Sequence, residues 1–343
     1  MIVVELLARH LEVNITPPEG RAGVVALRGI APSTRISPHP YLLYQNTPGY
    51  AADGYRQHDR QGYRGRRRRG GPVVLALGGS TTYGHLVPNP EDAWPARLAG
   101  LTGADVVNGG LNYATTAELL AHWAFRDRFL VPSVVIVHGP GNDTAPLLFD
   151  DYDPEYTKFR RGWERAPARA GERWILGTGL GRVAYAWWLQ LSPGGGLSWE
   201  PFPIAQLGHD QALANVRRHE PIGFRRNLEE LLASIQRSGA RPVYFEFVLA
   251  PATVYAGRRL SRGARYAESA YDAIAEGCEK ERKAAREVAA RLGVEYMVMP
   301  PPPVGRFLDH CHLDPAGEQL KAAFLAERLS LSSSMSPSCR RAQ

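Results

Sequence analysis

The chain has 343 residues, of which 44% are hydrophobic and 22% are charged, a composition close to that of ordinary globular domains. This length permits one large domain or two smaller ones with a sizeable buried core. Lys and Arg outnumber Asp and Glu by 41 to 34, which gives a formal net charge of +7. The dense basic cluster, RGRRRRGG at 64–71, is one loop without the reading element or stacking aromatics of a nucleic-acid site. We interpret it as a solvated or anion-contacting loop and expect no nucleic-acid partner.

The cysteines and the apolar runs bear on the compartment. Three cysteines, Cys278, Cys311 and Cys339, are too few and too odd in number for a disulfide framework, so a reducing compartment is expected. No stretch approaches the roughly 18 apolar residues of a membrane span. The first 18 residues lack the positive and long apolar regions of a signal peptide. We therefore expect a cytoplasmic protein, while association with the cell envelope and the oligomeric state stay open.

The predicted elements alternate along most of the chain. Residues 1–71 are rich in Pro, Gly, Tyr and Arg and predict an irregular leader packed on the main domain. After them, apolar runs predict strands at 73–77, 105–107, 133–138, 241–248 and 294–298. Amphipathic stretches predict helices at 91–101, 116–129, 224–238 and 264–292, and a last helix from Pro315. Val-, Ile- and Leu-rich strands separated by helices indicate an α/β protein with a parallel sheet.

The predicted domain boundaries follow from this alternation of strands and helices. We expect one domain over 72–331 and a disordered tail at 332–343. A Trp-rich insertion interrupts the domain at about 144–221. The insertion contains Trp163, Trp174, Trp187, Trp188 and Trp199. These tryptophans either form a lid or pocket wall over the site, or they fill a subsidiary core or face a partner.

The first candidate loop, GGSTTYG at 78–84, follows the first strand of the alternating region. Ligands of an open parallel sheet bind beyond the carboxyl ends of its strands. Glycines permit a sharp turn from strand to helix, and backbone N–H groups at a helix start stabilise an anion. The loop is not the G-x-S-x-G elbow, because Thr82 stands two residues after Ser80, and it lacks the lysine of a phosphate loop. Alone, the loop is weak evidence for a nucleophilic serine, and a structural turn is the better interpretation.

Two further loops carry asparagines at the ends of later strands. They are NGGLNYATT at 108–116 and HGPGND at 138–143. Asn108, Asn112 and Asn142, or backbone N–H groups beside them, could direct donors at one oxyanion. For each asparagine alone, a helix cap or a turn is the better interpretation.

The last segment, FLDHCHLDP at 307–315, supplies a possible base. Asp314 and Pro315 are typical of a helix N-cap and first residue. Asp309 and His312 then lie in the loop before that helix, where a carboxylate can hold one imidazole nitrogen and leave the other as a base. A zinc site on the HCH run is the alternative, but no second ligand pair accompanies it. We expect no metal and no cofactor.

These segments, taken in order and spacing, resemble the SGNH (GDSL-like) hydrolase superfamily over 71–329. The stretch NTPGYAADGYR at 46–56 is similar to the leader of many bacterial members. The resemblance implies an α/β fold, a three-layer α/β/α sandwich with a parallel, flavodoxin-like sheet of about five strands. It also implies that the catalytic residues are Ser80, Asp309 and His312. The implied oxyanion hole is formed by Ser80, Tyr113 and Asn142. The implied substrate contacts are Gly79, Thr81, Asn112 and Asp143.

The chain departs from the family pattern at three positions. Gly79 stands where many members have Asp, and Pro140 stands at the first position of the family's G-x-N-D segment. Tyr113 falls at the glycine position of the oxyanion loop. A glycine would be preferred there only if the backbone needs a positive φ or a close approach.

The resemblance implies a serine esterase that hydrolyses an acyl ester, for example an acetyl ester, of a carbohydrate or small metabolite through an acyl-enzyme. An acyltransferase using the same serine and a non-catalytic binding protein that kept the fold are the alternatives. A conventional α/β-hydrolase, with its acid well upstream of its histidine, is a third.

Overall fold

The structure, a computed structural model, describes eight stretches of the chain: 2–15, 35–39, 41–65, 72–139, 141–156, 178–191, 208–252 and 271–329. The predicted tail and most tryptophans of the predicted insertion lie outside these stretches. The division into leader, hydrolase domain, insertion and tail stays a prediction.

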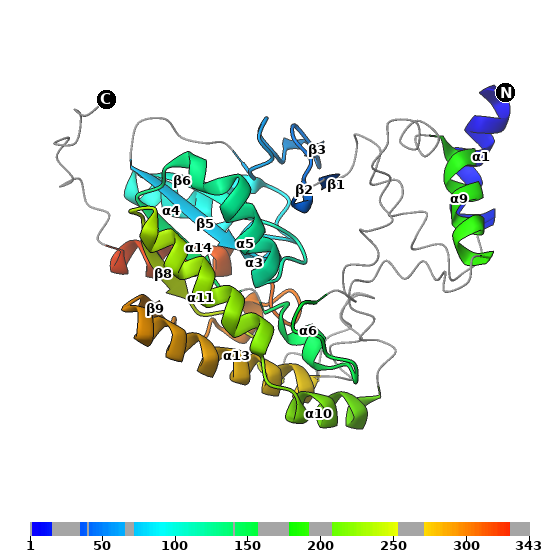
Figure 1. Cartoon of the computed structure of the whole chain (residues 1–343). Coiled ribbons are helices and arrows are strands. Elements are labelled where there is room, and N and C mark those ends of the chain that lie inside the picture. Colours follow the sequence, from blue (N-terminus) through cyan, green and yellow to red (C-terminus); the bar gives the residue numbers. More distant parts are fainter. Residues whose placement is uncertain are drawn as a thin grey trace.

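A five-stranded parallel sheet forms the centre of the molecule (Figure 1). Its strands are β5 (Val73–Gly78), β6 (Asp105–Gly110), β7 (Val134–His138), β8 (Arg241–Phe245) and β9 (Glu295–Met297). They lie in the order β6-β5-β7-β8-β9, and each neighbouring pair is parallel. Counted within the sheet this is the order 2-1-3-4-5 of flavodoxin-like folds. The predicted fold class is confirmed.

Alternate side chains of the strands pack against helices on opposite faces of the sheet (Figure 1). Leu75 and Val135 belong to the core shared with α5 (Thr116–Phe125), α11 (Ile222–Arg237) and α13 (Tyr271–Leu292). Val74 and Ile136 belong to the core shared with α4 (Trp94–Thr102) and α14 (Pro315–Arg328). Because helices cover both faces of the sheet, the strands are continuous apolar runs in the sequence. The sheet and the two helix layers form the three layers of the fold.

Shorter elements complete the described chain. They are the helices α3 (Ser80–Tyr83), α6 (Thr144–Leu147) and α10 (His209–Arg218), and the 3-10 turns η2 (Pro90–Asp92), η3 (Asp127–Leu130) and η8 (Val304–Arg306). Two antiparallel pairs precede the sheet: β1 (Ile36–His39) with β2 (Leu43–Asn46), and β3 (Ala51–Ala52) with β4 (Tyr55–Arg56).

Helices α1 (Ile2–Ile15) and α9 (Gly179–Leu191) pack side by side (Figure 1). The carboxylate of Glu5 on α1 accepts a hydrogen bond of 2.7 Å from the backbone N–H of Gly179 at the start of α9. This contact satisfies one of the free N–H groups at a helix start. Neither helix, nor any other helix in the described stretches, is long and apolar enough to cross a membrane.

The helix predicted at 116–129 is interrupted. It ends at Phe125 and continues as the 3-10 turn η3 after Arg126, whose φ is −139°. The carboxylate of the next residue, Asp127, is fully buried and accepts bonds of 2.8 Å from both Tyr63 Oη and Arg126 Nε. Satisfying this buried charge draws the chain out of the α-helix.

Residues before the sheet attach to the carboxyl end of β6. Tyr44 Oη donates to the carbonyl of Asn112 at 2.9 Å, and Asn46 Nδ2 donates to the carbonyl of Gly110 at 3.0 Å. The backbone N–H of Arg64 donates to the carbonyl of Asn108 at 3.1 Å. The loop after β6, which carries Tyr113, is therefore held from the N-terminal side of the chain.

The interpretation of 64–71 as a solvated loop is wrong for Arg64; residues 66–71 lie outside the described stretches. Arg64 is 6% exposed, and its guanidinium carbon lies 4.2 Å from the centre of the Tyr83 ring. Its Nη1 donates to the carbonyl of Gly84 at 3.1 Å, and its Nη2 donates to that of Val87. The burial of Arg64 is compensated because its guanidinium donates to these two carbonyls after α3; the Gly84 carbonyl also accepts the backbone N–H of Val87.

Candidate functional site

Ser80 lies at a sharp turn from β5 into α3. It is the first residue of α3, and Gly79 is the N-cap. A Cβ on Gly78 would lie 2.1 Å from Thr82 Oγ1, and a Cβ on Gly110 would lie 2.1 Å from the backbone nitrogen of Tyr83. Only glycine fits at both positions, because α3 lies directly against the ends of β5 and β6. This close approach presents Ser80 at the carboxyl edge of the sheet, where ligands of such folds bind.

The loop before α14 brings His312 to Ser80. His312 Nε2 lies 2.8 Å from Ser80 Oγ, and His312 Nδ1 lies 2.7 Å from Asp309 Oδ2. A carboxylate only accepts hydrogen bonds, so Nδ1 carries the proton and Nε2 is free to accept the proton of Ser80. The three residues predicted as catalytic therefore lie together in a serine–histidine–aspartate arrangement.

The loop geometry fixes Asp309. Its Oδ1 accepts the backbone N–H groups of Cys311 at 2.9 Å and His312 at 2.7 Å. Burial alone would raise the pKa of this carboxyl. The hydrogen bond and the charge of the His312 side chain, together with the two backbone N–H donors, bring the pKa below its usual value. Asp309 thus stays ionised and holds the imidazole in one orientation. The predicted helix start is also confirmed, since Asp314 Oδ1 accepts the N–H of Gly317 at 2.7 Å and Pro315 follows it.

Tyr113 adopts the backbone conformation that favours glycine. Its φ is +65°, and its side chain is 49% exposed. The left-handed region costs a residue with a Cβ roughly 1–2 kcal/mol. The family's preference for glycine at this position thus has a physical reason that still applies here, while the backbone N–H that an oxyanion would need is present.

Replacing Tyr113 with glycine should relieve this strain. We expect Tyr113→Gly to have a free energy of unfolding about 1 kcal/mol above that of Tyr113→Ala, which loses the same ring but keeps a Cβ. Urea unfolding followed by circular dichroism compares the two variants. Equal stabilities would show that the backbone at this position is unstrained.

Asn142 joins the third loop to the second. Its Nδ2 donates to the carbonyl of Ala114 at 2.9 Å. An amide nitrogen carries two hydrogens, so one N–H remains for a ligand. Pro140, the departure from the family pattern in this loop, lies outside the described residues.

A family model of the GDSL-like lipase/acylhydrolase family matches residues 76–320. The chain belongs to this family. The match confirms the predicted enzyme class, a hydrolase acting on ester bonds. A search of curated proteins gives no match.

Three solved structures similar to this chain are distant from it in sequence. An acetylxylan esterase from Geobacillus stearothermophilus is 12% identical with a TM-score of 0.42, covering 76% of this chain and 95% of its own. An aryl esterase from M. smegmatis is 15% identical with a TM-score of 0.43, covering 75% of this chain and 98% of its own. An α/β hydrolase from the metagenome of Lake Arreo is 16% identical with a TM-score of 0.43, covering 77% and 97%.

The predicted substrate-contacting residues of this GDSL-like enzyme lie in two kinds of environment. Thr81 and Asp143 are buried, and Asp143 accepts hydrogen bonds from Thr116 and Tyr156. Burial raises the pKa of the Asp143 carboxyl to about 7, against these hydrogen bonds. We infer that both side chains support their loops instead of contacting substrate. Gly79 contributes backbone only, and the side chain of Asn112 faces His85, with Nδ2 3.5 Å from its Nδ1.

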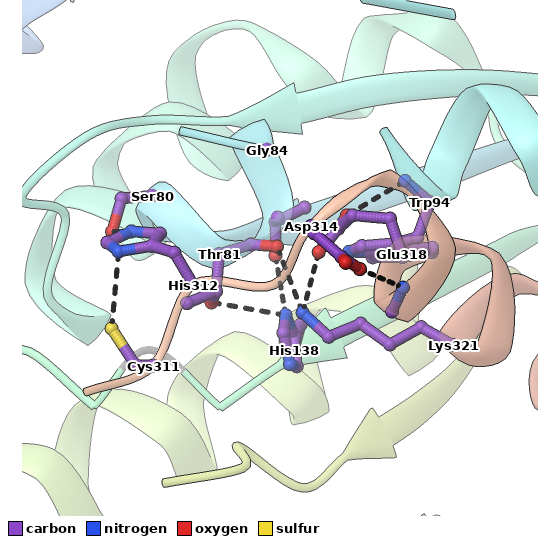
Figure 2. Close-up of polar contacts among 12 residues, drawn as sticks. Ser80, Thr81, Gly84, Trp94, His138, Cys311, His312, Asp314, Glu318 and Lys321 are labelled. Atoms are coloured by element: carbon purple, nitrogen blue, oxygen red, sulfur yellow. Dashed lines mark hydrogen bonds and ion pairs between the residues drawn. The ribbon is translucent and has the colours of Figure 1, made fainter. Parts of the chain in front are cut away.

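A buried polar cluster supports the turn that carries Ser80 (Figure 2). His138, at the end of β7, has its Nδ1 2.9 Å from Thr82 Oγ1 and 3.5 Å from Thr81 Oγ1. Lys321 Nζ on α14 donates to Glu318 Oε1 at 3.1 Å and lies 3.5 Å from the carbonyl of Thr81. Burial, and then the charge of Lys321, hold the pKa of His138 well below its usual value, so this ring is neutral. The cluster connects α3 to the sheet and to α14.

The sequence prediction missed this cluster and also missed His85. The rings of His85 and His312 lie 5.2 Å apart. A weak signal existed for Lys321, which follows Glu318 by one helical turn, but that spacing is equally typical of an exposed ion pair.

The HCH run next to Asp309 shares its possible metal ligands with the proposed catalytic residues. Asp309, Cys311 and His312 offer three ligand atoms within 4.8 Å of one another. Two of these residues are joined by the 2.7 Å hydrogen bond described above, and burial raises the pKa of the Cys311 thiol. Cys311 Sγ lies 3.5 Å from His312 Nδ1 (Figure 2). His310, between Asp309 and Cys311, is half-buried.

Proposed function

We propose that the protein is a serine esterase in which Ser80 is the nucleophile, His312 the general base and Asp309 the residue that orients it. The observation that carries the proposal is the pair of short contacts from His312, 2.8 Å to Ser80 Oγ and 2.7 Å to Asp309 Oδ2. Side chains within hydrogen-bond distance in this order activate a hydroxyl that is a poor nucleophile by itself.

The proposed reaction has two steps. Ser80 Oγ attacks the ester carbonyl while His312 Nε2 takes its proton, and the alcohol leaves with that proton to give an acyl-Ser80 enzyme. Water then attacks the acyl group, His312 again transfers the proton, and the acid is released. The backbone N–H groups of Ser80 and Tyr113 and the remaining N–H of Asn142 are the proposed donors to the oxyanion, each worth on the order of 10²–10³ in rate.

The proposed substrate is a small acyl ester, such as an acetyl ester, of a carbohydrate or metabolite. A panel of para-nitrophenyl esters of increasing acyl length tests this part. We expect hydrolysis that is fastest with acetyl or another short acyl group. Product analysis with and without added alcohols separates the esterase from an acyltransferase: release of free acid as the main product supports the esterase, whereas transfer to the alcohol as the main product contradicts it.

A further inference from the structure

A second histidine lies beside the proposed catalytic one and has a fixed tautomer. His85 follows α3 by two residues, and its ring centre is 5.2 Å from that of His312. His85 Nδ1 lies 2.8 Å from Arg35 Nη1 and 3.5 Å from Asn112 Nδ2. A guanidinium nitrogen can only donate, so His85 Nδ1 must accept and the proton must lie on Nε2. Burial, with the nearby positive charges, lowers the pKa of His85 to about 3, so the ring is neutral and Nε2–H is a donor next to the proposed catalytic pair.

Arg35 is a cation that has no anionic partner within the described stretches of the chain. Its Nη1 is bonded to a neutral ring, its Nε is buried without a hydrogen-bond partner, and among the described residues it forms no ion pair. Its guanidinium carbon lies 5.5 Å from the centre of the Tyr83 ring, which also contacts the cation Arg64 and the side chain of His58. A partly buried arginine without a carboxylate is costly unless a ligand supplies one.

The acidic groups near this pair are already engaged. Asp309 accepts bonds from His312 and two backbone N–H groups. Glu318 accepts from Lys321 Nζ and from the backbone N–H of Trp94 at 2.9 Å. Arg35 and His85 together therefore carry one net positive charge, and the Nε2–H of His85 remains available as a donor.

We propose that Arg35 and His85 form a subsite for a carboxylate of the substrate, so that the ester cleaved at Ser80 bears a negative charge on its acyl or its alcohol part. This inference rests on the proposed function, whose site it extends. The guanidinium of Arg35 supplies the positive charge that pairs with the single charge of a carboxylate, and His85 Nε2–H supplies a further hydrogen-bond donor. Arg35 also fixes the tautomer of His85 that makes Nε2 a donor. The segment before the sheet thus contributes a binding residue to the site.

Paired esters that differ in one charge test the subsite. Para-nitrophenyl hemisuccinate and its methyl ester place the charge on the acyl part; para-acetoxybenzoate and its methyl ester place it on the alcohol part. The measured quantity is the ratio of kcat/KM for the charged ester to kcat/KM for the neutral ester. For one pair, this ratio should be about tenfold lower in Arg35→Gln than in the wild-type protein, because KM for the charged ester rises. A tenfold change corresponds to one ion pair of about 1.4 kcal/mol. Arg60→Gln removes the same charge from an exposed position in the same segment and should leave the ratio unchanged. Ratios that do not change in Arg35→Gln for either pair would overturn the inference.

A binding measurement decides the inference without turnover. Calorimetry on Ser80→Ala protein gives the Kd of the charged ester of each pair. We expect the Kd of one of them to rise about tenfold when Arg35→Gln is added. Arg35→Lys, which keeps the charge but loses the planar fork, should give an intermediate Kd and guards against a folding defect in the glutamine variant. Equal Kd values with and without Arg35→Gln would refute the subsite, whereas normal binding with no hydrolysis by the wild-type protein would count against the esterase alone.

Discussion

Ser80→Ala is expected to lower kcat for ester hydrolysis by on the order of 10⁴ or more, to the level supported by binding and the oxyanion donors alone. The serine hydroxyl is the atom 2.8 Å from His312 Nε2, and no methyl group can replace it as a nucleophile. Hydrolysis of para-nitrophenyl acetate, followed by release of nitrophenolate, measures the loss. Circular dichroism should be unchanged, because alanine is a good helix residue at the start of α3.

Ser133→Ala is the matched control for that variant. Ser133 Oγ donates to the carbonyl of Val73 at 3.0 Å, at the opposite end of β5 from Ser80. This change removes the same kind of hydroxyl at a position away from the site and should leave kcat within about twofold, because changes of this kind away from a site cost a few tenths of a kcal/mol. Comparable activity in Ser80→Ala and in the control would refute the assignment of the nucleophile.

Asp309→Asn should also cost on the order of 10⁴ in kcat, although the side chain keeps its size. Asp309 uses one oxygen for two backbone N–H groups and the other for His312 Nδ1. An asparagine has a single oxygen, which the two backbone donors would occupy, and its NH₂ group would then face Nδ1. The imidazole would have to move its proton to Nε2, where it could no longer accept the proton of Ser80.

Asp314→Asn separates this effect from a general loss of charge. Asp314 lies in the same loop and caps α14 through Oδ1, a role that asparagine fills equally well. We expect activity close to that of the wild-type protein. A loss as large as that of Asp309→Asn would mean that the loop, and not the tautomer of His312, is what both variants disturb.

Local patterns predicted the parts of the fold that neighbouring residues determine. The apolar run ending at Leu77, the glycines around it and the Asp314–Pro315 helix start all depend on residues close in the chain, and the structure agrees with each. The β8 strand was predicted too long by three residues. The strand ends at Phe245, because β9 pairs with β8 only as far as Met297, which lies opposite Phe245.

The sequence could not predict the polar groups that become buried around Ser80. Lys321 lies 240 residues from Thr81 in the chain, and Arg35 lies 50 residues from His85. Each of these side chains is typical of an exposed surface, and only tertiary packing decides that it is enclosed. Arg64 shows the same limit, because its partners are backbone carbonyls of Gly84 and Val87, which follow α3 and carry no side-chain signature.

The positive φ of Tyr113 is an intermediate case. The family pattern identified the position, and the geometry of the loop after β6 explains why glycine is common there. Whether the chain would adopt that φ with a tyrosine could not be read from local sequence, because contacts such as Tyr44 Oη to the carbonyl of Asn112 hold the loop from a distant segment.

The most direct test of the proposed site is covalent labelling with a fluorophosphonate probe. An activated serine attacks the phosphorus and displaces fluoride, so intact mass analysis should show one adduct per chain, and peptide mapping should locate it on Ser80. The adduct should disappear in Ser80→Ala and form far more slowly in Asp309→Asn. No adduct on the wild-type protein, or an adduct that persists in Ser80→Ala, would contradict the assignment of Ser80 as the nucleophile.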